Sequence, residues 1–482
     1  MSAILARWSR PQDFYAERDN RTELEVRQLA LYATQPVEIV VDPFHAHTPA
    51  VQQAALIACN LTSRWARQVT VNTPDVDLCP KFRRDGLTLL GERIMAEMRS
   101  ADPFGSFALR DPHDLVKTRE PAPLRLFIGP WEEAASHGLA PDDYVVHALG
   151  WTALGRRGDG FGSGYSGSAT VAAAALAACV GVADLFKRAV GHERNEWVSD
   201  YSWCTWSHAF SPYTVKRDAP WPVLSSLDLG GVLLAGVGAI GSALAYLADF
   251  MTLRGRLVFL DRDCVETSNL NRSPLFTIWD ALAEAEKTTS VSNYLMRHDG
   301  LRLGTVTGTW AENGSRLARE GFDLWISLTN EDGAWAQVPF QLPPVILHGT
   351  TTSGWGFGAG RHIPRLDDCT ICRLPRPVAQ FRGPCAEGEM GGVAALAGAR
   401  ASLPFLSAAA AALILAELLK LGAPKYPLLP NDVSVDLRYG LPAVVAVSRV
   451  PTEGCRGCRA SNSKLWESRG GTGRYRPYSE AA

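Results

Sequence analysis

Residues 232–241 read VLLAGVGAIG, an apolar run that leads into three glycines at Gly236, Gly238 and Gly241. The run predicts a buried strand, and the residues after Gly241 predict a helix. Between these two elements the glycines permit a tight turn, close approach of the backbone to a phosphate, and close packing of helix on strand. The free N–H groups at the start of such a helix favour an anion. We therefore expect a Rossmann-type α/β unit here, although the glycine pattern alone also fits NAD- and FAD-dependent enzymes.

A polar segment follows the next predicted strand. Asp261 ends the apolar run 257–260, where a carboxylate can accept hydrogen bonds from ribose hydroxyls. Residues 261–272 then read DRDCVETSNLNR, and Lys287 follows further along the chain. Such an Asn/Arg cluster does not suit hydride transfer, but it suits the negative charge of a triphosphate. An NAD-binding oxidoreductase is therefore the disfavoured alternative.

Residues 261–272 resemble the adenylation domain of ubiquitin-activating enzymes and of the ThiF/MoeB-type enzymes that activate sulfur-carrier proteins. That family's pattern is D-x-D-x-V-x-x-S-N-L-x-R-Q followed by a lysine, and Ser273 stands here at the usual glutamine. The resemblance implies ATP and Mg²⁺. It implies that the three glycines, Asp261 and Asp263 bind ATP, with Asp261 on the ribose. Asn269, Arg272 and Lys287 would bind the phosphates, the last two where charge develops as pyrophosphate leaves.

One position departs from the family pattern. After the predicted strand 324–328 the family usually places an aspartate that helps to bind magnesium. Here the residues are Thr329, Asn330, Glu331 and Asp332, so Asn330 stands at that place in the ATP site and contributes no charge. The magnesium carboxylate must come from Glu331, Asp332 or elsewhere. Family enzymes also use an arginine from the partner half, for which Arg18, Arg21 and Arg27 are candidates.

Two C-x-x-C pairs, Cys369/Cys372 and Cys455/Cys458, have the spacing of zinc knuckles. Four thiolates on two such turns match a closed, structural Zn²⁺ site. A redox-active C-x-x-C is the rival interpretation, but two pairs within one α/β domain favour metal.

Cys385 lies beyond the first knuckle in the sequence GPCAEG. A loop flanked by glycine and proline is where an accessible nucleophile lies, whereas a structural cysteine usually lies in an apolar run. By resemblance to activating enzymes with a catalytic cysteine in a C-A-D-G context, Cys385 would capture the acyl group as a thioester. An unreactive loop thiol is the alternative.

Composition limits the classes of function. The formal net charge of −2 gives no sign of a nucleic-acid or anionic-membrane partner. The N-terminus has no apolar segment of signal-peptide length, and the alanine-rich run 401–419 predicts a buried helix rather than a membrane span. We expect a soluble, cytoplasmic protein with reduced cysteines.

The two halves of the chain resemble each other. Residues 178–187 (ACVGVADLFK) and 411–420 (AALILAELLK) are similar, and each precedes a strand-like segment, 195–203 and 431–439. An internal duplication is favoured over chance. The first strand, 37–41, is followed by Asp42-Pro-Phe-His rather than by glycines, which indicates an inactive copy.

The expected fold is thus α/β, with two Rossmann-like halves, one inactive and one active in adenylation, and a structural zinc site. The expected domains are an N-terminal arm, the inactive half, the active half with its crossover loop and knuckles, and a disordered tail, at residues 1–30, 31–221, 222–460 and 461–482.

The family resemblance is closest to bacterial activating enzymes of ubiquitin-like conjugation operons, which often serve antiphage defence. It implies a ubiquitin-like protein and a separate conjugating enzyme as partners. Activation of a sulfur-carrier protein for thiocarboxylate formation and a non-catalytic nucleotide-binding scaffold are the alternatives. The oligomeric state is left open by the sequence, because a duplication supplies both halves in one chain.

Overall fold

The structure is a computed structural model. It describes residues 7–20, 32, 34–112, 122–131, 139–161, 167–213, 222–329, 331, 333–352, 355–373, 403–422 and 430–461. The predicted nucleophile Cys385, the predicted ATP-site residue Asn330 and almost all of the predicted tail lie outside the described residues.

The first half alternates strands and helices and ends in short antiparallel strands. Its helices are α2 (Pro11–Arg18), α4 (Pro49–Ser63), η2 (Pro80–Phe82), α5 (Leu90–Ala101), α6 (Val171–Ala189) and η4 (Arg194–Glu196). Its strands are β1 (Val37–Val41), β2 (Gln68–Asn72), β3 (Ser106–Arg110), β4 (Leu124–Ile128), β5 (Tyr144–Leu149), β6 (Thr152–Arg157), β7 (Tyr201–Cys204) and β8 (Phe210–Ser211).

The second half repeats this plan. Its helices are α7 (Ala239–Ala248), η5 (Thr267–Asn269), α8 (Ile278–Leu282), α9 (Lys287–Leu295), α10 (Trp310–Leu317), η6 (Ala318–Glu320), α11 (Ala334–Gln337), η7 (Val338–Gln341), α12 (Thr370–Arg373), α13 (Pro404–Leu421) and α14 (Arg456–Ser461). Its strands are β9 (Ser226–Ala235), β10 (Thr252–Asp261), β11 (Leu301–Thr307), β12 (Leu324–Ser327), β13 (Ile346–Thr352), β14 (Gly356–His362), β15 (Asp432–Asp436) and β16 (Ala443–Val447).

The two eight-stranded sheets have the same topology. Their orders are β3-β2-β1-β4-β5-β6-β7-β8 and β11-β10-β9-β12-β13-β14-β15-β16. In each sheet the first five strands pair in parallel and the last three continue antiparallel. Matching order and direction at every position supports the expected duplication. The α/β fold with two Rossmann-like halves is confirmed.

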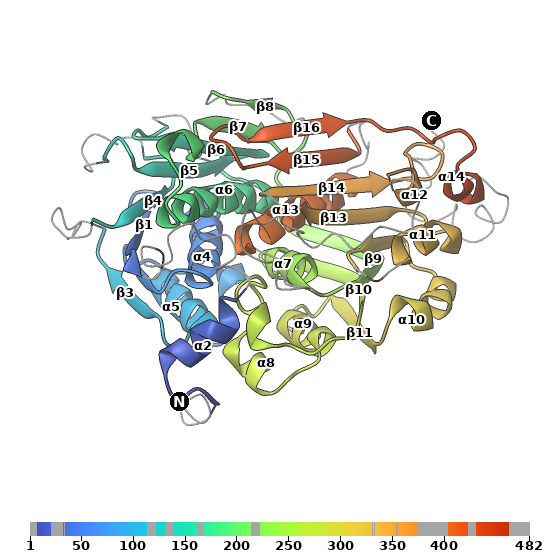
Figure 1. The fold of residues 1–482 in the computed structure, drawn as a ribbon, viewed down its shortest axis with the longest axis horizontal. Helices are drawn as coiled ribbons and strands as arrows, with labels where there is room; N and C mark the ends of the chain where they lie inside the picture. Colours follow the sequence, from blue (N-terminus) through green and yellow to red (C-terminus); the bar gives the residue numbers. More distant parts are fainter. Residues whose placement is uncertain are drawn as a thin grey trace, which may run out of the picture.

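The four helices α4, α6, α7 and α13 form the layer between the two sheets. One continuous apolar core joins their side chains to the inner faces of both sheets, and α6 lies beside α13 near the middle of the molecule (Figure 1). A second core fills the space between the outer face of the second sheet and α10, α11 and η7, and a third covers the outer face of the first sheet. Helix α13 is long and apolar enough to span a membrane, but it is wholly buried within the fold.

A reciprocal pair of lysines joins the halves. The Lys187 ammonium at the end of α6 donates to the backbone carbonyls of Arg438 and Tyr439, which follow β15 of the second half, at 3.3 Å each. The equivalent Lys420 at the end of α13 lies 2.9 Å from Nε2 of His208, which follows β7 of the first half. Each half therefore reaches across to the same place in the other, as a pseudo-twofold arrangement requires.

Three details differ from the sequence-based expectation. The sheets are mixed rather than wholly parallel, because a short turn at Gly150 and Trp151 folds β6 back against β5. Strands β3 and β6 were not predicted; β3 is largely exposed and lacks a continuous apolar run. The segment 195–203 contains the 3₁₀ turn η4 before β7 begins at Tyr201, because a reciprocal side-chain cap between Glu193 and Glu196 closes that turn.

Candidate functional site

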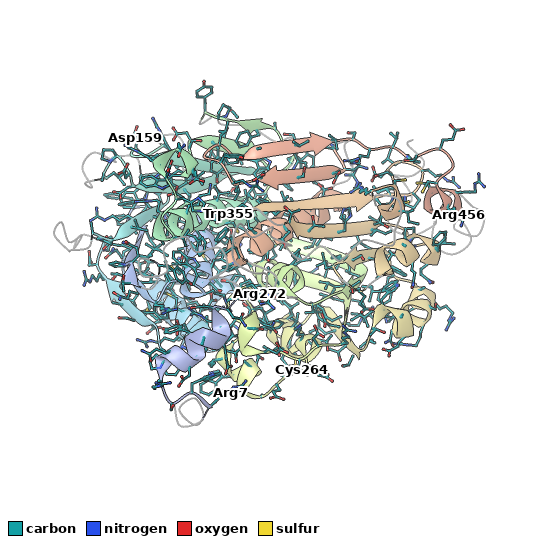
Figure 2. All side chains as sticks on the ribbon, in the orientation of Figure 1. Arg7, Asp159, Cys264, Arg272, Trp355 and Arg456 are labelled. Carbon is teal, nitrogen blue, oxygen red and sulfur yellow. The ribbon has the colours of Figure 1, made fainter. Side chains whose placement is uncertain are left out.

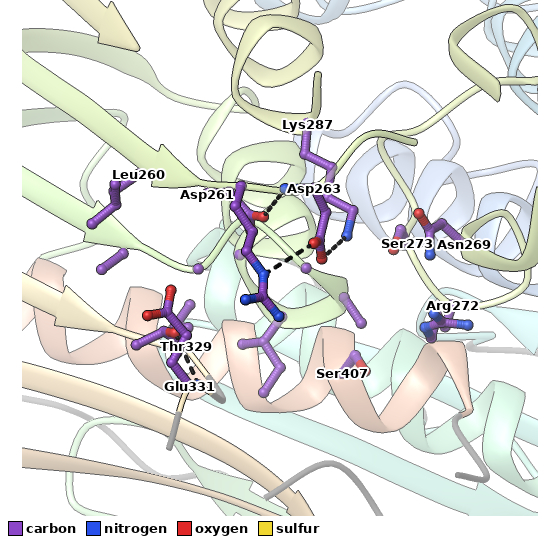
Figure 3. A pocket seen from close by; sticks show the side chains of 18 of the residues that line it. Leu260, Asp261, Asp263, Asn269, Arg272, Ser273, Lys287, Thr329, Glu331 and Ser407 are labelled. Atoms are coloured by element: carbon purple, nitrogen blue, oxygen red, sulfur yellow. Dashed lines mark hydrogen bonds and ion pairs between the residues drawn. The ribbon is translucent and has the colours of Figure 1, made fainter. Parts of the chain in front are cut away.

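A cavity of about 590 Å³ lies at the carboxyl ends of β9, β10, β12 and β13. The sheet order changes direction between β9 and β12, and ligands of open α/β sheets bind at such a switch point. The lining includes every predicted ATP-site residue that the structure describes (Figure 3): Gly236, Gly238, Gly241, Asp261, Asp263, Asn269, Arg272 and Lys287. The sequence pattern and the topology thus bring these residues to one place. Their individual roles remain predictions.

The glycine loop has three different steric environments. Gly236 has φ +93°, and a Cβ there would lie 2.5 Å from the carbonyl carbon of Leu328. A Cβ on Gly241 would lie 2.3 Å from the Gly236 carbonyl oxygen, so α7 can start close to β9 only without a side chain at this position. A Cβ on Gly238 would meet no atom within 4 Å. Since Gly238 lines the cavity, the space beside it is available to a ligand.

Asp261 ties the glycine loop to the next strand. Its Oδ2 accepts a hydrogen bond from the Val237 N–H at 2.6 Å, and its Oδ1 accepts from the Asp263 N–H at 3.0 Å. The carboxylate therefore orders the loop before any ligand binds. It lines the cavity beside Gly238, as a ribose-binding carboxylate should.

Lys287 and Asp263 form an ion pair on one side of the cavity (Figure 3). The Lys287 Nζ lies 2.8 Å from Asp263 Oδ2, and the Lys287 N–H donates to the Asp263 carbonyl at 3.0 Å. Partial burial opposes ionisation of Asp263, but the hydrogen bond and charge of Lys287 prevail and lower the pKa of this carboxyl. Lys287 itself is almost wholly buried. The pair places an ammonium and a carboxylate where a phosphate and its metal ion would meet.

Asn269 and Arg272 also line the cavity, on the side of Lys287 that lies away from Glu331 (Figure 3). The Asn269 side chain accepts from the Glu266 N–H at 3.0 Å, which closes the turn η5. The Arg272 guanidinium donates to the carbonyl of Ser268 and, at 3.2 Å, to the side chain of Asn271. These contacts hold in the lining two side-chain types that can bind phosphate.

Glu331 is the described member of the three residues that follow Thr329. Its two carboxylate oxygens accept from the Trp310 N–H at the start of α10, at 3.0 and 2.8 Å, and the residue lines the cavity. Together with Asp261 and Asp263 it offers carboxylate oxygens, the ligands that Mg²⁺ prefers. The lining therefore fits a magnesium-bound triphosphate, although Asn330 and Asp332 lie outside the described residues.

The structure rules out Arg18 as an arginine for the phosphates. Its guanidinium is fully buried and forms ion pairs with Asp19 and Asp102 of the first half, each at 2.6 Å. Arg21 and Arg27 lie outside the described residues. Arg7, which was not a candidate, lines a neighbouring cavity together with Cys264 (Figure 2).

In the described part of the first half, β1 does not lead into a glycine loop. Asp42 follows β1, and its carboxylate accepts from the N–H groups of Phe44 and Trp131 at 2.9 Å each. A Cβ on Gly129 would lie 2.4 Å from the Cβ of Asp42, so this turn is tightly filled. An internal carboxylate at this point repels a phosphate, which fits an inactive copy.

The four knuckle cysteines converge between α12 and α14. The Sγ atoms of Cys369 and Cys455 lie 3.5 Å apart, as do those of Cys372 and Cys458, while Cys369 and Cys372 are 3.8 Å apart. Four sulfurs about 2.3 Å from a tetrahedral zinc ion would be about 3.8 Å from one another. Hydrogen bonds from Cys369 and Cys372 lower the pKa of Cys458. The cluster fits the expected structural zinc site.

Several lining residues were not predicted from the sequence, and three of them come from elements beyond residue 340. Gly349 and Thr351 lie on β13, and Ser407 lies in the first turn of α13. None belongs to the family pattern around Asp261, and no local sequence signal marks them. They close the end of the cavity that faces the middle of the molecule.

Comparison with known proteins finds a family model that matches part of the chain. The uncharacterized protein y4jF of Sinorhizobium fredii (strain NBRC 101917 / NGR234) is 34% identical over 184 residues, which cover 37% of this chain and 34% of that protein. The chain therefore spans about a third of that relative's length. Among solved structures, E. coli MccB with ATP is 15% identical, with a TM-score of 0.37, over 49% of this chain and 67% of that one. E. coli MccB with selenomethionine MccA is 16% identical, also with a TM-score of 0.37, over 48% and 67%. Residues 222–320, which carry the glycine loop and the polar cluster, match the model of the ThiF family.

Proposed function

We propose that this chain catalyses the ATP-dependent adenylation of a carboxylate at the C-terminus of a protein or peptide partner. One observation carries the proposal. Within the segment that matches the ThiF family model, a single cavity combines the glycine loop, the Asp261 carboxylate and the cations Arg272 and Lys287. This arrangement suits a nucleoside triphosphate whose leaving group is highly charged.

The chemistry follows from these positions. A carboxylate oxygen of the partner attacks the α-phosphorus of ATP, and the bond from this phosphorus to the bridging oxygen breaks. Pyrophosphate leaves with that electron pair, and an acyl adenylate remains. Arg272 and Lys287 offset the charge that develops on pyrophosphate, which lowers the barrier. Asp263 and Glu331 would hold Mg²⁺, which would neutralise part of the same charge.

The finer proposal concerns the partner and the second step. A ubiquitin-like protein supplies the carboxylate, and the Cys385 thiolate attacks the carbonyl carbon of the acyl adenylate. AMP leaves, and the resulting thioester passes to the cysteine of a separate conjugating enzyme in the cytoplasm, in a conjugation system such as those of antiphage defence. The GPCAEG context of Cys385 supports this step.

Two alternatives share the nucleotide site. Activation of a sulfur-carrier protein would use the same adenylation and end in a thiocarboxylate. A nucleotide-binding scaffold without catalysis is favoured by a single residue, Asn330, at the position of the family's metal-binding aspartate. Glu331, which lines the cavity, supports catalysis instead.

Pyrophosphate exchange into ATP tests the first step. With a ubiquitin-like protein as the probe, exchange should depend on that protein and should be lost in Arg272→Ala. If purified wild-type chain binds no ATP and shows no exchange, the adenylation proposal fails. ATP binding without exchange would leave the scaffold.

A gel assay tests the second step. Wild-type chain should form a protein–protein adduct that a thiol reductant cleaves. Cys385→Ala should retain exchange and form no such adduct, and Cys264→Ala serves as the matched control because Cys264 is exposed at the cavity. An adduct that survives in Cys385→Ala would show that another cysteine is the nucleophile.

A further inference from the structure

A buried arginine of the first half contacts the polar loop of the nucleotide site. Arg64 follows α4, and only 1% of its surface is exposed. Its guanidinium donates to the backbone carbonyls of Leu270 at 2.8 Å, Phe276 at 3.0 Å and Pro274 at 2.6 Å. These three carbonyls flank Arg272 on both sides in the chain. One side chain therefore fixes the backbone that carries a phosphate-binding residue.

The chemical setting of Arg64 is unusual. Its fourth acceptor is the side-chain oxygen of Asn60 at 2.9 Å, so within the described part of the chain none of its acceptors is a carboxylate. A buried charge that is held only by neutral dipoles costs free energy. Burial lowers the pKa of Arg64 to about 9, which still leaves the guanidinium charged at neutral pH. If Arg64 only filled space, an apolar side chain could occupy this position without the cost of a buried charge.

Asn60 extends the same network to the helix that follows the glycine loop. Its Nδ2 donates to the Pro274 carbonyl at 3.1 Å and to Oε2 of Glu97 at 3.1 Å. The same Glu97 oxygen accepts from the hydroxyl of Tyr246 at 2.8 Å, and Tyr246 belongs to α7, the helix that follows the glycine loop. The first half thus supports both the glycine-loop helix and the polar loop.

The geometry points to Arg64, assisted by Asn60, as a positioning residue for adenylation that acts through Arg272. The inactive half then has a direct task in the chemistry, because it sets the position of the loop between Leu270 and Phe276. This inference rests on the proposed function in that Arg272 is taken to bind the phosphates of ATP. A displacement of about 1 Å at such a contact can cost up to 100-fold in rate.

Binding of two nucleotide probes separates positioning from general loss of structure. Adenosine shares the ribose with ATP but has no phosphate. Arg64→Lys keeps the positive charge but loses the several N–H donors of the guanidinium. Its affinity for magnesium-ATP should fall about tenfold or more, while its affinity for adenosine should stay within about twofold of the wild type. Arg157→Lys is the matched control, because Arg157 also donates to backbone carbonyls, those of Asp142 and Val198, but within the first half. Its ATP-to-adenosine ratio should equal that of the wild type.

A double-mutant cycle tests whether the effect passes through Arg272. In an Arg272→Ala background, Arg64→Lys should change ATP affinity by less than about twofold. An unchanged ATP-to-adenosine ratio in Arg64→Lys, or its full effect persisting in the Arg272→Ala background, overturns the inference. If Arg64→Lys does not fold, Asn60→Ala decides in the same way, with an expected loss of roughly threefold for ATP alone. Wild-type chain that binds no ATP would instead refute the proposed function.

Discussion

Replacing Gly238 with alanine should weaken nucleotide binding without destabilising the fold, whereas the same change at Gly241 should destabilise the fold. A methyl group on Gly238 meets no atom within 4 Å, and its φ of −74° lies outside the left-handed region that favours glycine. We expect its free energy of unfolding to stay within about 0.5 kcal/mol of the wild type. A methyl group on Gly241 would lie 2.3 Å from the carbonyl oxygen of Gly236. Because backbone must move to relieve this overlap, we expect a loss of roughly 1–3 kcal/mol or more.

The effect on binding follows from the size of a methyl group. Backbone N–H donors at the loop reach a phosphate oxygen at about 2.9 Å, whereas a carbon keeps it at about 3.5 Å or further. Loss of one charge-assisted hydrogen bond, worth about 1.5–3 kcal/mol, corresponds to a fall in ATP affinity on the order of 10- to 100-fold. Thermal unfolding measures the first quantity and titration calorimetry with magnesium-ATP the second. The assignment of this loop to phosphates would be refuted if Gly238→Ala bound ATP as tightly as the wild type. It would also be refuted if Gly238→Ala unfolded at as low a temperature as Gly241→Ala.

Three further predictions concern the zinc cluster, a buried histidine and the cavity lysine. Removal of zinc by a chelator, or the substitution Cys372→Ser, should lower the free energy of unfolding by several kcal/mol. Added zinc should restore the stability of the chelated wild type but not that of Cys372→Ser. Metal analysis that finds no zinc in protein purified without chelator would contradict this prediction. Burial, with a contribution from Lys420, lowers the pKa of His208 to about 4, so between pH 6.5 and 4 the unfolded chain binds a proton that the folded chain does not. The free energy of unfolding should therefore fall by about 3 kcal/mol as the pH drops through this window. Denaturant titrations of His208→Gln should show a correspondingly smaller fall. An equal dependence of stability on pH in both proteins would exclude His208 as the source. Lys287→Met should reduce pyrophosphate exchange roughly 100-fold or more while the midpoint of thermal unfolding changes little, and exchange at the wild-type rate would remove Lys287 from the chemistry.

Much of the nucleotide site could be predicted from the sequence because its signals are local. The turn after β9, the carboxylate that ends β10 and the cluster around Asn269 each follow a strand within a few residues. Carboxyl ends of neighbouring parallel strands meet at one edge of a sheet, so these segments had to converge. The zinc cysteines were predictable for a related reason, since each C-x-x-C turn brings two ligands together by itself.

The contacts that cross between the halves could not be predicted in this way. The hydrogen bonds of Arg64 join residues more than 200 positions apart, and no periodicity encodes them. Ser407 enters the cavity only because α13 packs against α7. Arg18 is the opposite case, a residue that the sequence suggested for the site and the structure places elsewhere. Its charge and its place in the arm made it a candidate for the phosphates, while its buried partner Asp102 lies 84 residues away.

The reciprocal lysines have a consequence for how this protein behaves on dilution. Lys187 and Lys420 make contacts across the interface between the two halves. The same interface would join two separate subunits if the halves were not one polypeptide. Two subunits joined this way would separate as their concentration fell, and the loop that Arg64 holds would then lose its support. A covalent connection makes the local concentration of one half around the other constant. The geometry of the nucleotide cavity is therefore independent of how few copies of the protein a cell contains.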